Sequence, residues 1–99
     1  MHKFILGIAL SLALAGTAVA DEIADRYAKS CKICHEAGVG GAPKTGDPGQ
    51  WAPRLEKGMD ALVMAVEKGV PPMMPAKGMC NDCTADEYKA LIEYMATAK

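Results

Sequence analysis

Hydrophobic residues recur every three or four positions in three stretches of this chain, the spacing that gathers them on one face of an α-helix. In the first stretch, Ile23, Tyr27 and Cys31 follow one another at four-residue intervals, which predicts a helix over residues 22–33. No segment alternates between apolar and polar residues in the way that a half-exposed strand does. The pattern therefore predicts an all-α fold.

The second and third stretches predict helices over residues 59–68 and 85–97. The second helix should end at Gly69, because two prolines follow it and cannot continue a helix. The third should begin after Thr84, since Thr84 and Glu87 have the spacing of a capping box. The two apolar stripes consist of Met59, Leu62, Val63 and Val66, and of Tyr88, Leu91, Ile92 and Met95.

Residues 38–49 separate the first two helices and contain five glycines and two prolines. This density of residues that free or restrict the backbone favours a loop without regular structure. Glycine-rich loops also bind phosphate, but no strand precedes this one, and its glycine spacing is not that of a P-loop or a dinucleotide-binding loop. Phosphate binding is therefore not expected here.

Residues 1–20 have the three parts of a secretory signal peptide: a basic start, an apolar run over residues 4–15, and Ala18-Val19-Ala20 as the cleavage site. The run is too short for a good membrane-spanning helix, so an uncleaved anchor is the weaker interpretation. Cleavage would leave one domain, residues 21–99, in which no apolar run is long enough to cross a bilayer. We expect an exported protein in an oxidising compartment, the bacterial periplasm.

A domain this short has a small core and usually needs a metal, a cofactor or a disulfide to stabilise it. We expect the first and last helices to cross, with Tyr27 against the side that carries Leu91, Tyr94 and Met95. Residues 21–99 contain ten Lys and Arg against twelve Asp and Glu, a net charge of −2. That balance gives no support to nucleic-acid binding, which needs a concentrated basic surface, so proteins are the expected partners.

Cys31, Cys34 and His35 form a Cys-x-x-Cys-His motif, the spacing at which a peptide is attached covalently to haem. The two thiols stand about one helical turn apart, so both can reach the vinyl groups on one edge of a porphyrin and form thioether bonds. His35 then lies under the iron and supplies a neutral nitrogen ligand. We therefore predict one covalently bound haem c at the end of the first helix, covered by the loop over residues 38–49.

A methionine thioether is the expected ligand on the other side of the iron. Met73 and Met74 lie among the prolines at 71, 72 and 75, whose fixed φ angles would hold the chain extended and present one thioether rigidly. One of the two is expected to bind iron, favouring the reduced state and closing the sixth coordination position. Methionines in the predicted helices are more simply explained as core-filling side chains: Met59, Met64 and Met95.

Three segments of residues 21–99 occur together: Cys31-x-x-Cys34-His35, Trp51-Ala52-Pro53-Arg54, and Met74-Pro75-Ala76-Lys77-Gly78 followed by Cys80-x-x-Cys83. In this combination the chain resembles the class I c-type cytochromes, most closely the cytochrome c5 family. The resemblance covers all of residues 21–99 and implies a small cytochrome c fold, with three to four helices wrapped around one haem. Met79 departs from the family's usual pattern, in which Gly commonly precedes the first cysteine of the last pair.

The resemblance also implies the roles of individual residues. It makes Cys31 and Cys34 the haem attachment points, His35 and Met74 the axial ligands, and Cys80 and Cys83 a disulfide. The Pro43 carbonyl is expected to accept the His35 Nδ1 proton. Trp51 and Arg54 are expected to hold the haem propionates, with core packing as an equal alternative for Trp51. Met73, and less readily Met79, are the alternatives to Met74.

A closed iron site indicates a one-electron carrier and not an enzyme. Its expected partners are redox proteins such as an oxidase, a reductase or a dehydrogenase, and the protein itself is expected to be a monomer or a weak dimer. Basic residues near the loops around the haem could form a docking rim, with solvated surface charge as the default explanation. These residues are Lys44, Lys57, Lys68, Lys77 and Arg54.

Two other functions would fit parts of this sequence. A haem-containing subunit of a redox enzyme, such as a peroxidase or a sulfur-oxidising complex, is the alternative function, and it would need an open iron site. The four cysteines could instead form a zinc site, but the predicted export counts against this, and His35 would then have no role.

Overall fold

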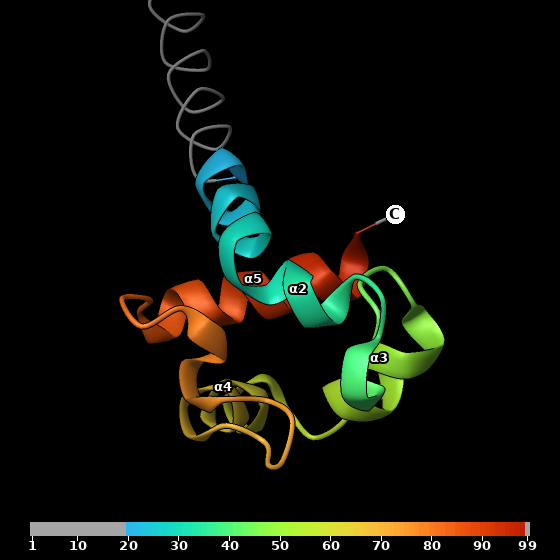
Figure 1. Ribbon diagram of the computed structural model, residues 1–99. Helices are drawn as coiled ribbons and strands as arrows, with labels where there is room; N and C mark the ends of the chain where they lie inside the picture. Colours follow the sequence, from blue (N-terminus) through green and yellow to red (C-terminus); the bar gives the residue numbers. More distant parts are fainter. Residues whose placement is uncertain (1–19, 99) are drawn as a thin grey trace, which may run out of the picture.

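The first helix ends in the Cys-x-x-Cys-His motif, as the sequence predicts. The computed structural model describes residues 20–98. Its N-terminal helix, residues 20–35, consists of an α-helical segment over residues 20–26, the π-helical turn η1 (Tyr27–Cys31) and α2 (Lys32–His35) (Figure 1). The helix predicted over residues 22–33 is thus confirmed and continues to His35. The predicted signal peptide, residues 1–20, lies outside the described residues apart from residue 20.

The π-helical turn η1 determines which side chains face inward. Its Lys32 N–H bonds to the Tyr27 carbonyl, five residues back, instead of four as in an α-helix. The wider turn keeps Tyr27, Ser30 and His35 on one buried face, although the step from Ser30 to His35 would leave that face in a regular α-helix. The motif histidine therefore points into the molecule.

The helix α3 (Pro48–Leu55) was not predicted. The irregular loop that the sequence predicts over residues 38–49 includes Pro48 and Gly49, and this part of the prediction is wrong. Asp47 caps the helix by accepting a hydrogen bond from the Gln50 N–H at 3.3 Å, and Pro48 occupies its first turn, where its missing N–H costs nothing. Before Pro48, the loop contains only η2 (Val39–Gly41), a short 3₁₀ turn.

The helices α4 (Met59–Lys68) and α5 (Ala85–Thr97) have the predicted bounds. The capping box at the start of α5 is formed, since Thr84 Oγ1 accepts from the Glu87 N–H and Glu87 Oε1 accepts from the Thr84 N–H. Buried residues line one side of α5, whereas α4 has none that is fully buried. Leu62 and Val66 of the apolar stripe of α4 line the cavity described below, so part of their surface stays accessible.

The chain between α4 and α5 is folded back on itself. The sequence predicted an extended segment around Met73 and Met74, and this is wrong: residues 71–73 form a turn closed by two backbone hydrogen bonds of 2.9 Å between Val70 and Met74. The 3₁₀ segment η3 (Ala76–Met79) follows. A single antiparallel bridge thus replaces the extended segment, and residues 20–98 contain no strand.

The N-terminal helix and α5 cross at one side of the molecule, with α3 and α4 around the other sides (Figure 1). At the crossing, the rings of Tyr27 and Tyr94 lie with centroids 5.0 Å apart, as expected from the apolar faces. The buried core consists of Ile23, Tyr27, Trp51, Cys80, Tyr88, Leu91, Ile92 and Met95. Within the described residues, none of the helices combines the length and the apolar character that a membrane span needs. The predicted all-α fold is confirmed.

Candidate functional site

A cavity of about 400 Å³ lies between the N-terminal helix, α3, α4, α5 and the folded segment around Met74. This volume is in the range of cofactor sites, and most of the lining side chains are apolar. The structure brings together the haem attachment sites, the candidate ligands, Met79 among them, and the haem surroundings that the sequence proposed. Those lining the cavity are Cys31, Cys34, His35, Pro43, Trp51, Arg54, Met73, Met74 and Met79.

The two cysteines of the motif are free thiols at the edge of this cavity. Cys31 closes η1 and Cys34 lies in α2, so the helix itself sets their separation. Burial raises the pKa of the Cys31 thiol to about 11, which keeps it protonated and uncharged near neutral pH. The pair can therefore supply two thioether bonds from one edge of the cavity.

His35 is held from its side chain and from its backbone. Its Nδ1 donates to the Pro43 carbonyl at 2.8 Å, the contact that the family resemblance implied. Its own carbonyl accepts from the Thr45 N–H at 2.8 Å, and the Thr45 hydroxyl bonds to the Tyr27 hydroxyl at 2.8 Å. With Nδ1 engaged as a donor, the lone pair of Nε2 is the one available to a metal.

Trp51 and Arg54 come from the unpredicted helix α3. The indole ring of Trp51 is 4% exposed and stacks on the His35 ring, with centroids 5.9 Å apart. Its one N–H donates to the Lys44 carbonyl at 2.9 Å, so it is not free to bind a propionate, and the packing alternative describes its contacts. Arg54 Nη1 donates to the Gln50 carbonyl at 2.7 Å, which leaves its other nitrogens available.

Three methionines around the turn and η3 line the cavity, and their environments differ. Met74 is half-buried, and both its N–H and its carbonyl are bonded to Val70. Met73 is 54% exposed and lies on the Gly40 backbone, so close that a Cβ on Gly40 would come within 2.8 Å of Met73 Cε. Met79 is 46% exposed and has a φ of +67°. Of the three, Met74 is the one whose backbone is fixed on both sides.

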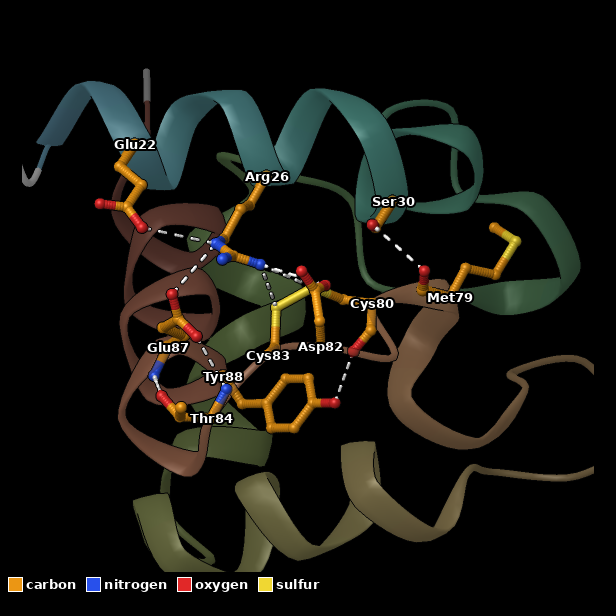
Figure 2. A network of polar contacts seen from close by, with 10 residues as sticks. All are labelled: Glu22, Arg26, Ser30, Met79, Cys80, Asp82, Cys83, Thr84, Glu87 and Tyr88. Atoms are coloured by element: carbon orange, nitrogen blue, oxygen red, sulfur yellow. Dashed lines mark hydrogen bonds and ion pairs between the residues drawn. A yellow bond between two sulfur atoms is a disulfide. The ribbon is translucent and has the colours of Figure 1, made fainter.

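The second cysteine pair is separate from the first. Cys80 and Cys83 are disulfide-bonded, with Cα atoms 5.5 Å apart, in the loop between η3 and α5. Bonded sulfurs are not zinc ligands, so the structure does not offer the four thiolates that the alternative zinc site requires. Figure 2 shows the disulfide next to Arg26, on the side of the N-terminal helix.

The charged side chains that line the cavity are basic. Arg54, Lys57 and Lys77 contribute to its lining, and none of the lining residues in the described part of the chain is Asp or Glu. Of the other two basic residues that the sequence placed near the haem, neither Lys44 nor Lys68 lines it. The lining of the cavity is therefore mostly apolar, with a positively charged part formed by these three basic residues.

Sequence reasoning did not identify Tyr27, Thr45 and Lys44 as supports of the site. Tyr27 was expected only to pack against α5, and the Lys44 contact is made by a backbone carbonyl, which no side-chain pattern reveals. These contacts bring the loop over residues 43–45 against the N-terminal helix and α3. The residues present fit a covalently attached haem: two free thiols, a histidine with an oriented ring, and a half-buried thioether around one apolar cavity.

Comparisons with known proteins agree with this fit. The family model described as cytochrome c oxidase, cbb3-type, subunit III matches residues 18–95. The chain is 41% identical to cytochrome c5 of Ectopseudomonas mendocina over 83 residues, which cover 82% of this chain and 91% of that protein. The similarity thus extends across nearly the whole of that cytochrome.

Two solved structures have the same fold. A mono-haem ferrocytochrome c from Shewanella putrefaciens superposes with a TM-score of 0.69 at 49% identity, covering 78% of this chain and 94% of that one. A cytochrome c solved in an electron-transfer complex with nitrite reductase gives a TM-score of 0.64 at 40% identity, covering 71% and 84%. The motif, the cavity and these similarities agree, and the chain belongs to the class I c-type cytochromes, close to the cytochrome c5 group.

Proposed function

We propose that this protein is an exported one-electron carrier whose single haem c is attached through Cys31 and Cys34 and ligated by His35 and Met74. Membership of the cytochrome c family supports the role as an electron carrier, because such proteins are electron-transfer proteins with one covalently bound haem and not enzymes. The ligand assignment is supported by one observation above all. His35, with Nδ1 bonded to Pro43, and Met74, fixed by two hydrogen bonds, line the same apolar cavity.

The bound haem supplies a single iron that alternates between its ferric and ferrous states. The chain holds that iron in a constant environment. The Pro43 carbonyl fixes the orientation of the His35 ring, while the Val70 hydrogen bonds restrict the backbone of Met74. The Met74 thioether and the His35 imidazole would both hold the haem iron, a ligand pair that would favour the reduced state and leave no coordination position for a substrate. Fixed ligands move little when the charge changes, which suits rapid electron exchange.

The proposed partner is a redox protein with an acidic docking surface. A related cytochrome c forms an electron-transfer complex with nitrite reductase, which supports docking onto a larger redox enzyme. In this chain, Arg54, Lys57 and Lys77 border the cavity without an acidic neighbour in its lining. Complementary charge accelerates the encounter of such partners, and the apolar mouth then brings the two redox centres close.

We further propose a periplasmic location and a monomeric or weakly dimeric protein. The arrangement of residues 1–20 supports export, since it matches the parts of a signal peptide. A disulfide between Cys80 and Cys83 suits an oxidising compartment.

Absorption spectra of the full chain expressed with periplasmic export test the function. We expect sharp reduced bands that carbon monoxide does not change, and a haem that stays on the chain under denaturing conditions. Met74→Ala should open the iron, so that carbon monoxide shifts the reduced bands, whereas the matched variant Met73→Leu should keep the unmodified spectrum. A carbon monoxide shift in the unmodified protein would instead support the enzyme-subunit alternative. If carbon monoxide shifts the reduced bands of Met73→Leu but not those of Met74→Ala, the iron ligand is Met73.

A further inference from the structure

Arg26 is the centre of a polar network between the N-terminal helix, α5 and the disulfide loop (Figure 2). Its Nε lies 3.0 Å from Glu87 Oε2, and its Nη1 lies 3.3 Å from Asp82 Oδ1. The same Nη1 is 3.5 Å from Cys80 Sγ and 3.4 Å from Cys83 Sγ. One guanidinium thus contacts both sulfurs and the start of α5, although it lies more than fifty residues away in sequence.

The ion pairs that Arg26 forms differ in strength. The side chains of Arg26 and Glu87 are 23% and 22% exposed, so their ion pair is partly shielded from water, and the capping box with Thr84 already fixes Glu87. The side chain of Asp82 is 84% exposed. Glu22 Oε1 lies 3.7 Å from Arg26 Nε, and the Glu22 side chain is 61% exposed. Both of these ion pairs therefore contribute less to stability than the pair with Glu87 does. Arg26 is therefore anchored on α5 and reaches from there to the disulfide.

The disulfide loop continues directly into the segment that carries Met74. The Tyr88 hydroxyl donates to the Cys80 carbonyl at 2.7 Å, and the Cys80 N–H donates to the Lys77 carbonyl at 2.9 Å. One turn beyond Arg26, the Ser30 hydroxyl points to the Met79 carbonyl at 3.5 Å (Figure 2). Residues 77–80 are thus held between the N-terminal helix on one side and α5 on the other.

Met74 rests against this held segment. A Cβ on Gly78 would lie 3.3 Å from Met74 Cε, so the Met74 methyl group packs on the Gly78 backbone. The segment is not one that the chain adopts readily, since Lys77, Gly78 and Met79 have φ values of +66°, +55° and +67°. Two of these are non-glycine residues in a backbone region that is unfavourable for them, and such a conformation persists only where its surroundings impose it.

We infer that Arg26 is a positioning residue for the Met74 ligand, acting through the Cys80–Cys83 loop and η3. This inference rests on the proposed ligation of the iron by Met74. By fixing the disulfide loop to the start of α5, Arg26 restricts the movements of η3 that would withdraw Met74 from the cavity. Lysine would not reproduce this, because a single ammonium is a point charge that can pair with Glu87 or approach the disulfide but cannot do both as a planar fork does.

Competition by imidazole for the ferric iron measures how readily the Met74 ligand is released. In the full-length holo-protein, we expect Arg26→Met to bind imidazole about tenfold more tightly than the unmodified protein. Arg26→Lys should keep the Glu87 ion pair and a denaturation midpoint close to the original, yet should still bind imidazole several-fold more tightly. The assay is run at a pH above the pKa of free imidazole, where the probe is neutral and the lost positive charge does not itself attract or repel it.

Lys29→Met is the matched control, because Lys29 is an exposed residue of the same helix and has no ion pair or side-chain hydrogen bond within residues 20–98. It removes the same charge and should leave imidazole binding unchanged. If Arg26→Met lowers the denaturation midpoint but binds imidazole as Lys29→Met does, Arg26 is merely structural and the inference is wrong. If Arg26→Met does not accumulate, an unchanged affinity in Arg26→Lys overturns it equally.

The ferric spectrum of the unmodified protein distinguishes a failure of this inference from a failure of the proposed Met74 ligation. If its ferric spectrum lacks a thioether band, Met74 is not the ligand and both fail together. If that band is present and Met74→Ala removes it, but the Arg26 variants bind imidazole like the control, the ligation stands and only the role of Arg26 is refuted.

Discussion

At the scale of single residues, the least favourable backbone in the described chain lies at Lys77 and Met79, two non-glycine residues with positive φ. Met79 is 46% exposed, so replacing its side chain loses little buried apolar contact. We expect Met79→Gly to raise the free energy of unfolding by about 1 kcal/mol, because glycine adopts this conformation without the steric cost. Denaturant unfolding of the holo-protein measures the change.

Gly78→Ala is the opposite substitution in the same segment. The φ of Gly78 is +55°, and the Cβ that alanine adds would lie 3.3 Å from Met74 Cε. Gly78→Ala should therefore destabilise the protein and displace the Met74 side chain. Met79→Gly should leave the ferric spectrum as it is. A loss of stability in Met79→Gly would show that the Met79 side chain makes a contribution larger than the strain at its backbone.

Residues could be predicted where one short pattern contains the whole chemistry. Cys31, Cys34 and His35 lie within five positions, so their spacing on a helix was enough to indicate haem attachment. Arg26 could not be found in that way. Its partners on the disulfide loop and α5 lie more than fifty positions away, and nothing in the sequence around Arg26 indicates which charges the fold will bring to it.

At the scale of elements, the capping box makes the start of α5 a defined contribution to stability. Thr84 Oγ1 accepts from the Glu87 N–H at 3.2 Å, and Thr84→Ala removes this acceptor. We expect Thr84→Ala to lower the free energy of unfolding by about 1 kcal/mol, which in a domain of this size lowers the melting temperature by about 4–8 °C. Differential scanning calorimetry of the holo-protein measures the shift.

Thr97→Ala makes the same chemical change at the other end of α5. The Thr97 hydroxyl only donates to the Glu93 carbonyl, at 2.6 Å, on an exposed turn, so its removal should change the free energy of unfolding by less than about 0.5 kcal/mol. Equal shifts in the two variants would mean that the capping box adds nothing beyond an ordinary surface hydroxyl.

Element prediction succeeded where apolar periodicity and caps agreed and failed where proline and glycine dominated. The bounds of α4 and α5 follow from their stripes, from Gly69 and from Thr84. In α3, the Asp47-Pro48 start was an available signal, but the glycines around it favoured a loop. The prolines around Met73 suggested extended chain, whereas the Val70–Met74 hydrogen bonds close a turn. Those hydrogen bonds form because the chain folds back on itself after Val70, and the φ preferences of individual prolines do not specify that reversal.

At the scale of the whole molecule, charge is distributed unevenly although the total is nearly balanced. The full chain has a net charge of −1, yet the lining of the cavity includes Arg54, Lys57 and Lys77 and no acidic residue among those described. A local field of this kind acts on approaching reactants within about 8 Å at physiological ionic strength. The rate of electron transfer through this face should therefore depend less on net charge than on which charges line the cavity.

Small oxidants of opposite charge test this field without an identified partner. The double variant Lys57→Gln with Lys77→Gln should slow oxidation of the ferrous protein by anionic hexacyanoferrate(III) about fivefold at low salt, and should not slow oxidation by a cationic cobalt phenanthroline complex. Near 1 M salt the Debye length falls to about 3 Å, so the difference from the unmodified protein should nearly vanish.

The matched control is Lys29→Gln with Lys89→Gln, which removes the same charge from two exposed helix positions that do not line the cavity. If electrons leave through the basic border, this control should react with both oxidants as the unmodified protein does. If both double variants slow the anionic oxidant equally, the effect reflects net charge alone. The basic border would then have no special role, and the proposed acidic partner would lose its main support.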